Sequence, residues 1–281
     1  MQKIDLITDS ACDLDLNTLR ENNINLLPLR IIYSNGDYRD RIDISPQEVY
    51  DNLEKEVPKT SLPSAKETEE VLNKLEEEGY THVICISISS GLSGSFNSIR
   101  LALEDHPKLT SFVYDSKILA YPQGEIVLEV AKLIKEGKSY EEIIKEIPEI
   151  RKRVTGYFTI NTLEYLKRGG RIGRLAGTVG ELLNLKPIIT TDEDGIYYNV
   201  AKVRGRKQSL SKMTELLKGY LAKGKCEVAV LHASCEDEAI KYMNSLKDLT
   251  NVISIKIAEI SPALGIHGGP GLIGFSVKMV K

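Results

Sequence analysis

The stretch THVICISISSGLSGSFNSIRLALE, residues 81–104, contains three successive patterns that decide the fold. Thr81–Ile88 is a near-continuous apolar run, which is typical of a strand buried on both faces of a parallel sheet. Ser89–Gly94 is rich in serine and glycine, and Ser95–Glu104 has the pattern of a helix. A strand, a short loop and a helix in this order predict one unit of a βαβ arrangement.

Strand and helix patterns alternate on both sides of this unit. The other strands expected in the first half are Ile4–Thr8, Ile24–Tyr33 and Phe112–Asp115. The expected helices are Leu14–Asn22, one beginning at the Ser45-Pro46 capping signal, Thr68–Glu78, Gln123–Glu136 and Tyr140–Arg151. The alternation predicts a mainly parallel N-terminal α/β domain over residues 1–155.

The pattern changes near Thr155, where hairpins mix with helices. Pro187–Thr191 and Ile196–Val203 flank Asp194-Gly195, a typical hairpin turn. Further strands are expected at Gly156–Ile160, Glu227–His232, Val252–Ala258 and Leu272–Val280, and helices at Leu163–Lys167, Val179–Asn184, Ser209–Leu221 and Glu236–Leu246. We therefore expect a C-terminal α+β domain over residues 156–281, with a ligand cleft where the two domains meet.

Composition excludes several classes of protein. The 281 residues carry a net charge of −3, which gives no general attraction to nucleic acid or to an anionic membrane. The longest apolar runs are shorter than the roughly 20 residues of a membrane-spanning helix. No targeting segment is visible, and the four cysteines include no CxxC pair, so we expect a cytoplasmic protein. His232 and Cys235 have HxxC spacing without a second pair, so no metal site is expected.

The serines of the loop admit three interpretations: a nucleophile, a phosphate cradle, or a neutral hydrogen-bonding clamp for a small anion. The loop follows the carboxyl end of a strand and precedes a helix, where unpaired N–H groups favour an anion. One serine would suffice as the helix cap. The hydroxyls here come from Ser89, Ser90, Ser93 and Ser95. Their number, with Gly91 and Gly94 between them, favours binding.

The nucleophile interpretation requires a histidine base and a carboxylate. Gly91–Ser95 differs from the G-x-S-x-G elbow at its last position, where Ser95 replaces glycine. His267 is the histidine with a functional setting. A serine hydrolase or a phosphotransferase using Ser93 and His267 remains the alternative, although no G-x-x-x-x-G-K-[ST] motif for a self-contained kinase occurs.

Three more segments carry binding chemistry. Pro58–Ser64 is held extended by its prolines and displays Thr60 and Ser61. Ser261–Gly271 is expected to be a glycine-rich loop that approaches a ligand closely. The basic runs Lys167–Arg174 and Lys202–Lys207 lack interleaved aromatic residues, so they favour phosphate or carboxylate capture over nucleic acid.

In combination and in this order, these motifs resemble the DegV family. The resemblance covers essentially the whole chain and rests on Thr8-Asp9-Ser10, Thr60–Ser64, Ser89–Ser95, Tyr165–Ile172, Lys202-Val203-Arg204 and His267–Gly271. It implies a two-domain α/β protein that buries one long-chain fatty acid in a tunnel at and near the domain interface. It also implies that the carboxylate is presented to a separate ATP-dependent fatty acid kinase, whose acyl phosphate product feeds bacterial phospholipid synthesis.

The resemblance also assigns residues. The carboxylate would be bound around Thr60, Ser61, Ser93, Gly94 and Ser95. Phosphoryl transfer with the kinase partner would involve Arg171, Arg204 and His267. The chain would then be a lipid carrier with no catalytic residues of its own and no cofactor besides the bound fatty acid.

Overall fold

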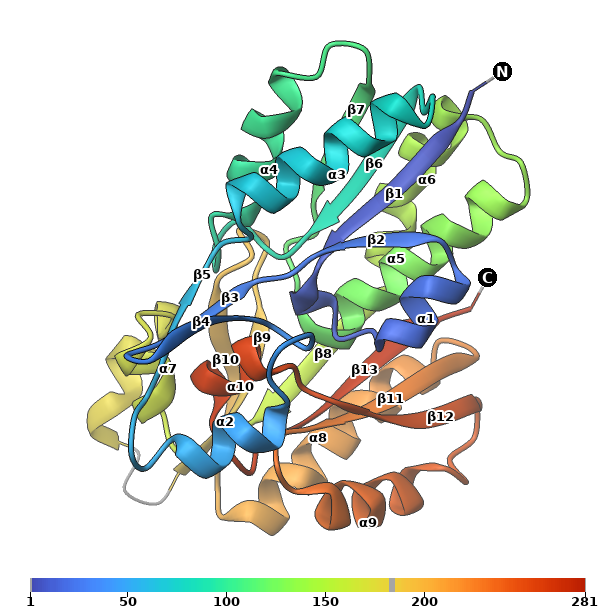
Figure 1. Cartoon of the computed structure of the whole chain (residues 1–281). Helices are drawn as coiled ribbons and strands as arrows, with labels where there is room; N and C mark the ends of the chain where they lie inside the picture. Colours follow the sequence, from blue (N-terminus) through green and yellow to red (C-terminus); the bar gives the residue numbers. More distant parts are fainter. Residues whose placement is uncertain (1, 182–184, 281) are drawn as a thin grey trace.

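The computed structural model describes residues 2–181 and 185–280, and within these ranges the strands form three sheets (Figure 1). From edge to edge, the parallel sheet contains β2 (Ile24–Leu27), β1 (Ile4–Asp9), β6 (His82–Ser87) and β7 (Thr110–Asp115). All its neighbouring strands run parallel, as predicted. The apolar run Thr81–Ile88 contains β6, an interior strand with neighbours on both sides.

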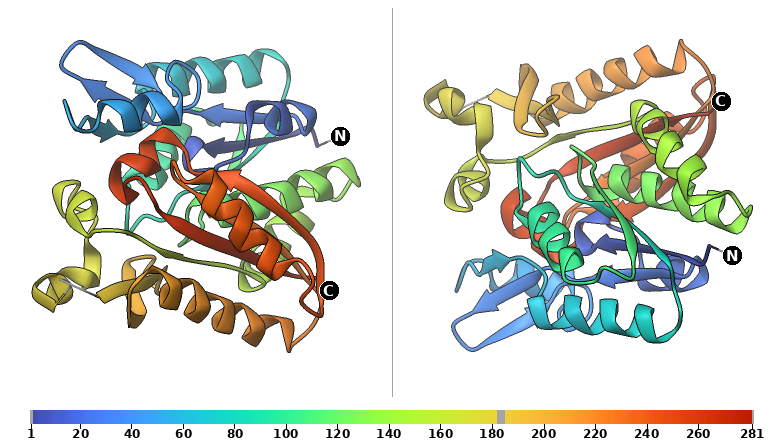
Figure 2. Two further views of the ribbon diagram at one scale, coloured as in Figure 1. Left: turned by 90° about the horizontal axis from the view of Figure 1, so that it is seen from below. Right: turned by 90° about the horizontal axis from the view of Figure 1, so that it is seen from above.

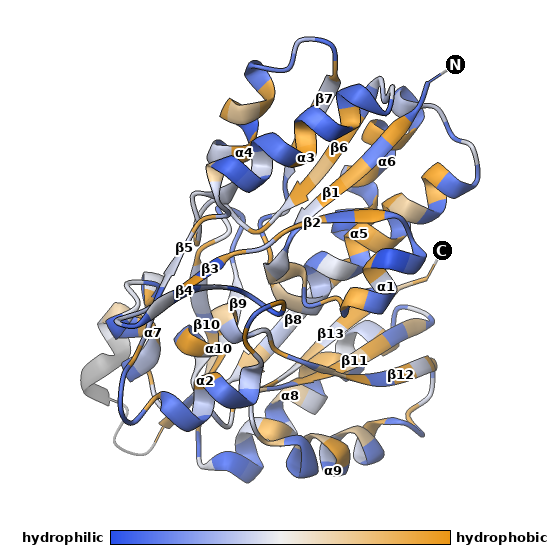
Figure 3. Cartoon of the chain, viewed as in Figure 1, coloured by the Kyte–Doolittle hydropathy of each residue, from blue (hydrophilic) through white to orange (hydrophobic). Residues whose placement is uncertain are grey.

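Helices cover both faces of the parallel sheet, which explains why β6 is apolar at successive positions. Val83 and Cys85 pack under α3 (Ala65–Glu77) and α4 (Ser95–Glu104). Ile84 and Ile86 belong to the core on the other face, with α5 (Ala120–Lys135) and α6 (Tyr140–Lys152). In Figure 3, β6 is largely apolar, whereas much of α3 is polar. The remaining helices of this half are η1 (Ser10–Cys12), α1 (Leu16–Glu21) and α2 (Pro46–Asn52), the last begun by the predicted Ser45 cap.

The predicted strand Ile24–Tyr33 is wrong, because the structure divides it between two sheets. Pro28 follows β2 and has no N–H to donate to a ladder. The Leu29 amide then donates to the Ser10 hydroxyl, and the Leu29 carbonyl accepts a hydrogen bond from the Asp40 amide. These two bonds turn the chain away from β1. The second part becomes β3 in a small antiparallel sheet ordered β4 (Gly36–Arg39), β3 (Arg30–Tyr33) and β5 (Lys59–Ser61).

The C-terminal half is built on a mixed sheet (Figure 2). Its order is β10 (Tyr197–Arg204), β9 (Leu185–Thr191), β8 (Val154–Thr159), β13 (Ile273–Met279), β11 (Cys226–His232) and β12 (Val252–Glu259). The predicted hairpin is confirmed as β9–β10, and β11–β12 is parallel whereas the other pairs are antiparallel. One face is covered by α8 (Arg206–Leu221) and α9 (Glu236–Leu246).

Helix α5 packs between the parallel and the mixed sheet. It is apolar on most of its circumference, as expected of a helix surrounded by core. Ala229 and Leu231 of β11 share its core, whereas Val228 and Val230 point to α8 and α9. The domain boundary after residue 155 stays a prediction, and that position lies within β8.

Two shorter predictions in the second half need correction. The predicted loop Ser261–Gly271 contains a helix, α10 (Pro262–Gly268), with Pro262 at its first position. The predicted helix Val179–Asn184 overlaps the 3-10 segment η2 (Gly173–Glu181), and its residues 182–184 lie outside the described residues. The predicted helix before it is confirmed as α7 (Glu164–Arg168). Across the described residues, no helix is both long enough and apolar enough to span a bilayer.

Candidate functional site

In the serine-rich loop after β6, the first two serines bond to neighbouring segments, and a later serine lines a cavity. Ser89 is fully buried, and its hydroxyl donates to the main-chain oxygen of Gly195 at 2.8 Å. The Ser90 hydroxyl accepts a hydrogen bond from Lys117 Nζ at 3.1 Å, and the Ser90 amide donates to the Asp115 carboxylate. These two serines attach the loop to its neighbours. Ser93 is the loop serine that lines the cavity.

Ser93 lies just before α4, whose N-cap is Gly94. The Ser93 and Ser95 hydroxyl oxygens are 2.9 Å apart, and the Ser95 amide donates to Ser93 Oγ at 3.3 Å. Ser95 is fully buried, and neither Gly94 nor Ser95 belongs to the cavity lining. Ser95 therefore supports Ser93 from behind. The N-cap residue Gly94 has no side chain to cap α4, and among the loop serines it is Ser93 whose hydroxyl accepts the first helical amide.

β5 and α10 also line the cavity, and they contact each other there. Thr60 of β5 and His267 of α10 form a hydrogen bond of 2.8 Å between Oγ1 and Nε2. Ser61 is exposed at the rim and also lines the cavity. The structure thus brings together Thr60, Ser61, Ser93 and His267, which are far apart in the sequence.

His267 is held as a neutral ring. Burial, and then the charge of Arg171, lowers its pKa from 6.5 to about 4. The α-carbon of Gly169 is so close that a methyl group there would lie 2.0 Å from Nδ1. That nitrogen is buried and has no hydrogen-bond partner among the described residues. Without a carboxylate on Nδ1, His267 lacks the partner that orients a hydrolase base.

Arg171 supplies the positive charge of the cavity. Its Nε donates to the main-chain oxygen of Leu92 at 3.2 Å, and its Nη1 donates to that of Gly169 at 2.6 Å. The guanidinium group therefore ties the serine loop to the segment that packs against His267. The predicted partner in phosphoryl transfer, Arg204, is elsewhere: it is exposed at the end of β10 and does not line the cavity.

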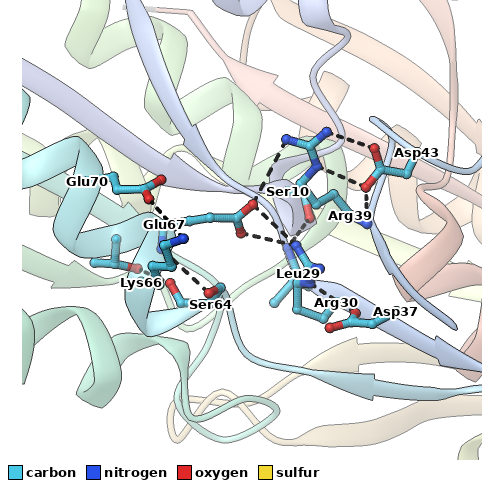
Figure 4. Close-up of polar contacts among 11 residues, drawn as sticks. Ser10, Leu29, Arg30, Asp37, Arg39, Asp43, Ser64, Lys66, Glu67 and Glu70 are labelled. Carbon is cyan, nitrogen blue, oxygen red and sulfur yellow. Dashed lines mark hydrogen bonds and ion pairs between the residues drawn. The ribbon is translucent and has the colours of Figure 1, made fainter.

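An ion-pair network anchors β5 on the far side of the small sheet (Figure 4). Arg30 of β3 contacts Asp37 at 3.0 Å and Glu67 at 3.1 Å, and Glu67 lies in the first turn of α3. Arg30 pairs with Ser61 in the sheet, and Ser64 caps α3. The network thus joins β3, which pairs with β5, to the start of α3, which follows β5, and a fixed binding site needs such support.

Two cavities meet at this site. The polar cavity, of about 200 Å³, is lined by Leu29, Thr60, Ser61, Leu62, Ile88, Leu92, Ser93, Leu119, Arg171, Tyr197, Ala263, Leu264 and His267. The narrower apolar cavity, of about 50 Å³, is lined by Ile118, Leu119, Ala120, Pro122, Gly156, Tyr157, Phe158, Leu166, Thr190, Thr191, Tyr197, Leu231, Ile260, Leu264, Gly268 and Leu272. Leu119, Tyr197 and Leu264 line both, so the cavities adjoin.

This arrangement suits an amphipathic anion. The polar lining offers hydroxyls, a neutral imidazole and the Arg171 cation, and it includes no carboxylate. The adjoining lining is almost wholly aliphatic and aromatic. Among the described residues, no cluster of three or more His, Cys, Asp or Glu side chains could hold a metal ion.

Sequence reasoning missed the apolar cavity and the backing of the clamp. Leu119 and Tyr197 carry no pattern that separates a cavity wall from ordinary core. Gly169 is different, because the Gly169-Gly170 pair is a sequence signal that could have indicated a close backbone approach, although only anion capture was predicted for this basic run. The structure shows that the approach is to His267, a residue of the protein itself.

Comparisons with known proteins agree on one family. The family model described as "Uncharacterised protein, DegV family" matches residues 3–279. A DegV domain-containing protein of Clostridium perfringens is 51% identical over 278 residues, covering 99% of each chain. DegV from Bacillus subtilis, a fatty acid binding protein of known crystal structure, has a TM-score of 0.92 at 32% identity over 100% of both chains. A stearic acid-binding protein from Eubacterium ventriosum has a TM-score of 0.87 at 29% identity, covering 99% of this chain and 98% of its own.

Proposed function

Because this chain belongs to the DegV family, we propose that it binds a long-chain fatty acid, with the carboxylate in the polar cavity and the acyl chain along the apolar one. The observation that carries the proposal is the junction of the two cavities. The Bacillus and Eubacterium relatives, which bind fatty acids, support it.

The polar residues hold the head group without a tight ion pair. The hydroxyls of Thr60, Ser61 and Ser93 donate to carboxylate oxygens, and Arg171 provides the favourable field. Each hydrogen bond to a charged group contributes roughly 1.5–3 kcal/mol. Burial of the acyl chain at about 0.8 kcal/mol per CH₂ supplies most of the affinity, so the clamp mainly fixes the position of the carboxylate.

We further propose that the bound acid is phosphorylated by a separate ATP-dependent kinase in the cytoplasm, and that the product feeds phospholipid synthesis. A carboxylate oxygen attacks the γ-phosphorus of ATP on the partner, the bond from phosphorus to the ADP oxygen breaks, and acyl phosphate and ADP result. Arg171 and His267 lie at the reacting end. Arg204, exposed at the end of β10, would contact the partner or its nucleotide from the surface.

Ligand binding is tested by native mass spectrometry of gently purified protein. We expect about one fatty acid per chain, with hexadecanoic or octadecenoic acid rebinding to delipidated protein. A preparation without lipid that also fails to bind added fatty acid would contradict the proposed function.

The kinase step is tested separately with protein loaded with hexadecanoic acid, ATP and a bacterial fatty acid kinase. Arg204→Ala should keep its lipid and lose roughly 10²–10³ in acyl phosphate formation. Lys207→Ala, also an exposed cation, should retain the rate. Equal rates for both variants would remove Arg204 from the transfer.

A further inference from the structure

Leu119, Tyr197 and Leu264, which line both cavities, form the neck between them. We propose that this neck restricts the ligand to acids that carry no substituent on the carbons next to the carboxyl group. The inference rests on the proposed function and names the class of fatty acid that the site accepts. The three side chains come from three elements: the residue preceding α5, the first residue of β10, and α10.

The position of the neck decides which part of the ligand it touches. Leu264 precedes His267 by three residues in α10, so the two side chains lie on one face about one turn apart. His267 contacts the clamp residue Thr60 directly. The carbons that pass Leu264 are therefore those beside the carboxylate, and the methyl end lies well beyond.

The wall formed by Leu119 is fixed by its main chain. Ala120 is buried and has φ of 59°, a left-handed conformation that costs a residue other than glycine about 1 kcal/mol or more. Leu119 itself is extended, and the preceding carbonyl of Ile118 accepts the Ser89 amide at 2.9 Å and the Ser116 hydroxyl at 3.0 Å. Such a conformation persists where its surroundings determine it, so Leu119 has little freedom to withdraw.

The other two walls are equally supported. The Tyr197 ring is buried and meets Phe158 edge-on, with ring centroids 5.3 Å apart. The part of α10 that follows Leu264 is closely packed: a methyl group on Gly265 would lie 2.2 Å from Tyr50 Oη, and one on Gly268 would lie 2.5 Å from Leu272. A neck with three fixed walls cannot widen for a branch without moving these elements.

The experiment compares four probes by displacement of a fluorescent fatty acid. They are hexadecanoic acid, its α-methyl and α,α-dimethyl derivatives, and an acid of equal length with its methyl branch at the far end. On the wild-type protein, the far-branched acid should bind within a few-fold of hexadecanoic acid. The α-methyl acid should bind roughly 10–200-fold more weakly, the range for one misplaced methylene in an apolar pocket, and the α,α-dimethyl acid at least as weakly.

Leu119→Ala should reduce that discrimination several-fold, and Leu264→Ala provides a second opening of the same neck. Leu101→Ala is the matched control, because Leu101 is exposed on α4 and lines neither of the two cavities. Thermal unfolding confirms that each variant is folded, and either neck variant suffices.

Equal binding of the α,α-dimethyl and parent acids by the wild-type protein would overturn the proposal while leaving fatty acid binding intact. Discrimination that persists in a folded neck variant, or falls equally in Leu101→Ala, would overturn it as well. Failure of hexadecanoic acid itself to bind would instead overturn the proposed function.

Discussion

At the scale of single residues, identical side chains in one loop have different tasks. Ser89 uses its hydroxyl to hold the β9–β10 turn through Gly195, whereas Ser93 presents its hydroxyl to the polar cavity. His267 is similarly distinguished by its surroundings, because burial and Arg171 keep it neutral. The chemistry of the site is therefore set by the burial and the neighbours of each side chain as much as by the type of side chain.

Ser93→Ala and Ser89→Ala should separate these tasks. Ser93→Ala removes a proposed donor to the carboxylate, so hexadecanoic acid should bind roughly tenfold to a hundredfold more weakly. Ser89→Ala leaves the Gly195 carbonyl without its buried donor and should lower the free energy of unfolding by about 1–3 kcal/mol. Isothermal calorimetry and thermal unfolding measure the two effects. The reverse assignment, with affinity lost only in Ser89→Ala, would place the head group elsewhere.

At the scale of elements, regular periodicity predicted most strands and helices, and the exceptions have local causes. β6 and its flanking helix followed from the apolar run, and the β9–β10 hairpin followed from its Asp-Gly turn. α10 did not, because its glycines suggested a loop. They serve close packing within a helix instead, and Asp40 accepts the Ala263 amide at 2.9 Å in its first turn. Glycine content alone does not distinguish these two uses.

Gly265→Ala should test the close packing of α10. The added methyl group would lie 2.2 Å from Tyr50 Oη, so overpacking should lower the free energy of unfolding by roughly 1–3 kcal/mol and weaken ligand binding through the displaced His267. The Tyr50 hydroxyl is buried without a partner among the described residues, so Tyr50→Phe should restore part of the loss.

Gly219→Ala in α8 is the control for Gly265→Ala. It has open space around it and should gain up to about 1 kcal/mol from helix propensity. Denaturant unfolding measures the free energy of unfolding of both variants. A Gly265→Ala protein as stable as the Gly219→Ala protein would show that α10 accommodates the added methyl group, which would contradict the close packing.

At the scale of the whole molecule, the site depends on how distant layers meet. The polar cavity takes lining from the small sheet, the serine loop, α10 and the region around Arg171. The motifs predicted that hydroxyls would gather at strand ends, because parallel strands end at a common edge. They could not predict the apolar cavity, whose walls are ordinary core residues, or the exposed position of Arg204. The apolar cavity depends on how the two sheets pack around α5.

The packing of α5 against the mixed sheet should be sensitive to pH through Glu125. This side chain is buried, accepts the Ser276 hydroxyl, and has its pKa raised from 4.5 to about 8 by burial. Lys278, Lys256 and Glu227 act on it more weakly. Between these pH values the folded state retains a proton that the unfolded state has lost. The free energy of unfolding should therefore fall as pH rises from about 4.5 to about 8, and level off above.

Glu125→Gln keeps a neutral partner for Ser276 and should remove that decline, on the order of a few kcal/mol. Glu129→Gln, one turn further along α5, should preserve it, because the pKa of Glu129 is already below its usual range. Urea unfolding at successive pH values measures both. An unchanged slope in Glu125→Gln would assign the dependence to another group.

The place of β13 in the mixed sheet has a consequence for folding during synthesis on the ribosome. β13 separates β8 from β11, although every other strand of that sheet precedes it in the chain. The ribosome therefore completes β8 to β12 before it makes the strand that joins them. His267 also emerges after β8 to β12, so its hydrogen bond to Thr60 cannot form earlier. Under the proposed function, ligand uptake therefore comes at the end of synthesis, and a nascent chain interrupted before His267 lacks part of the proposed head-group site.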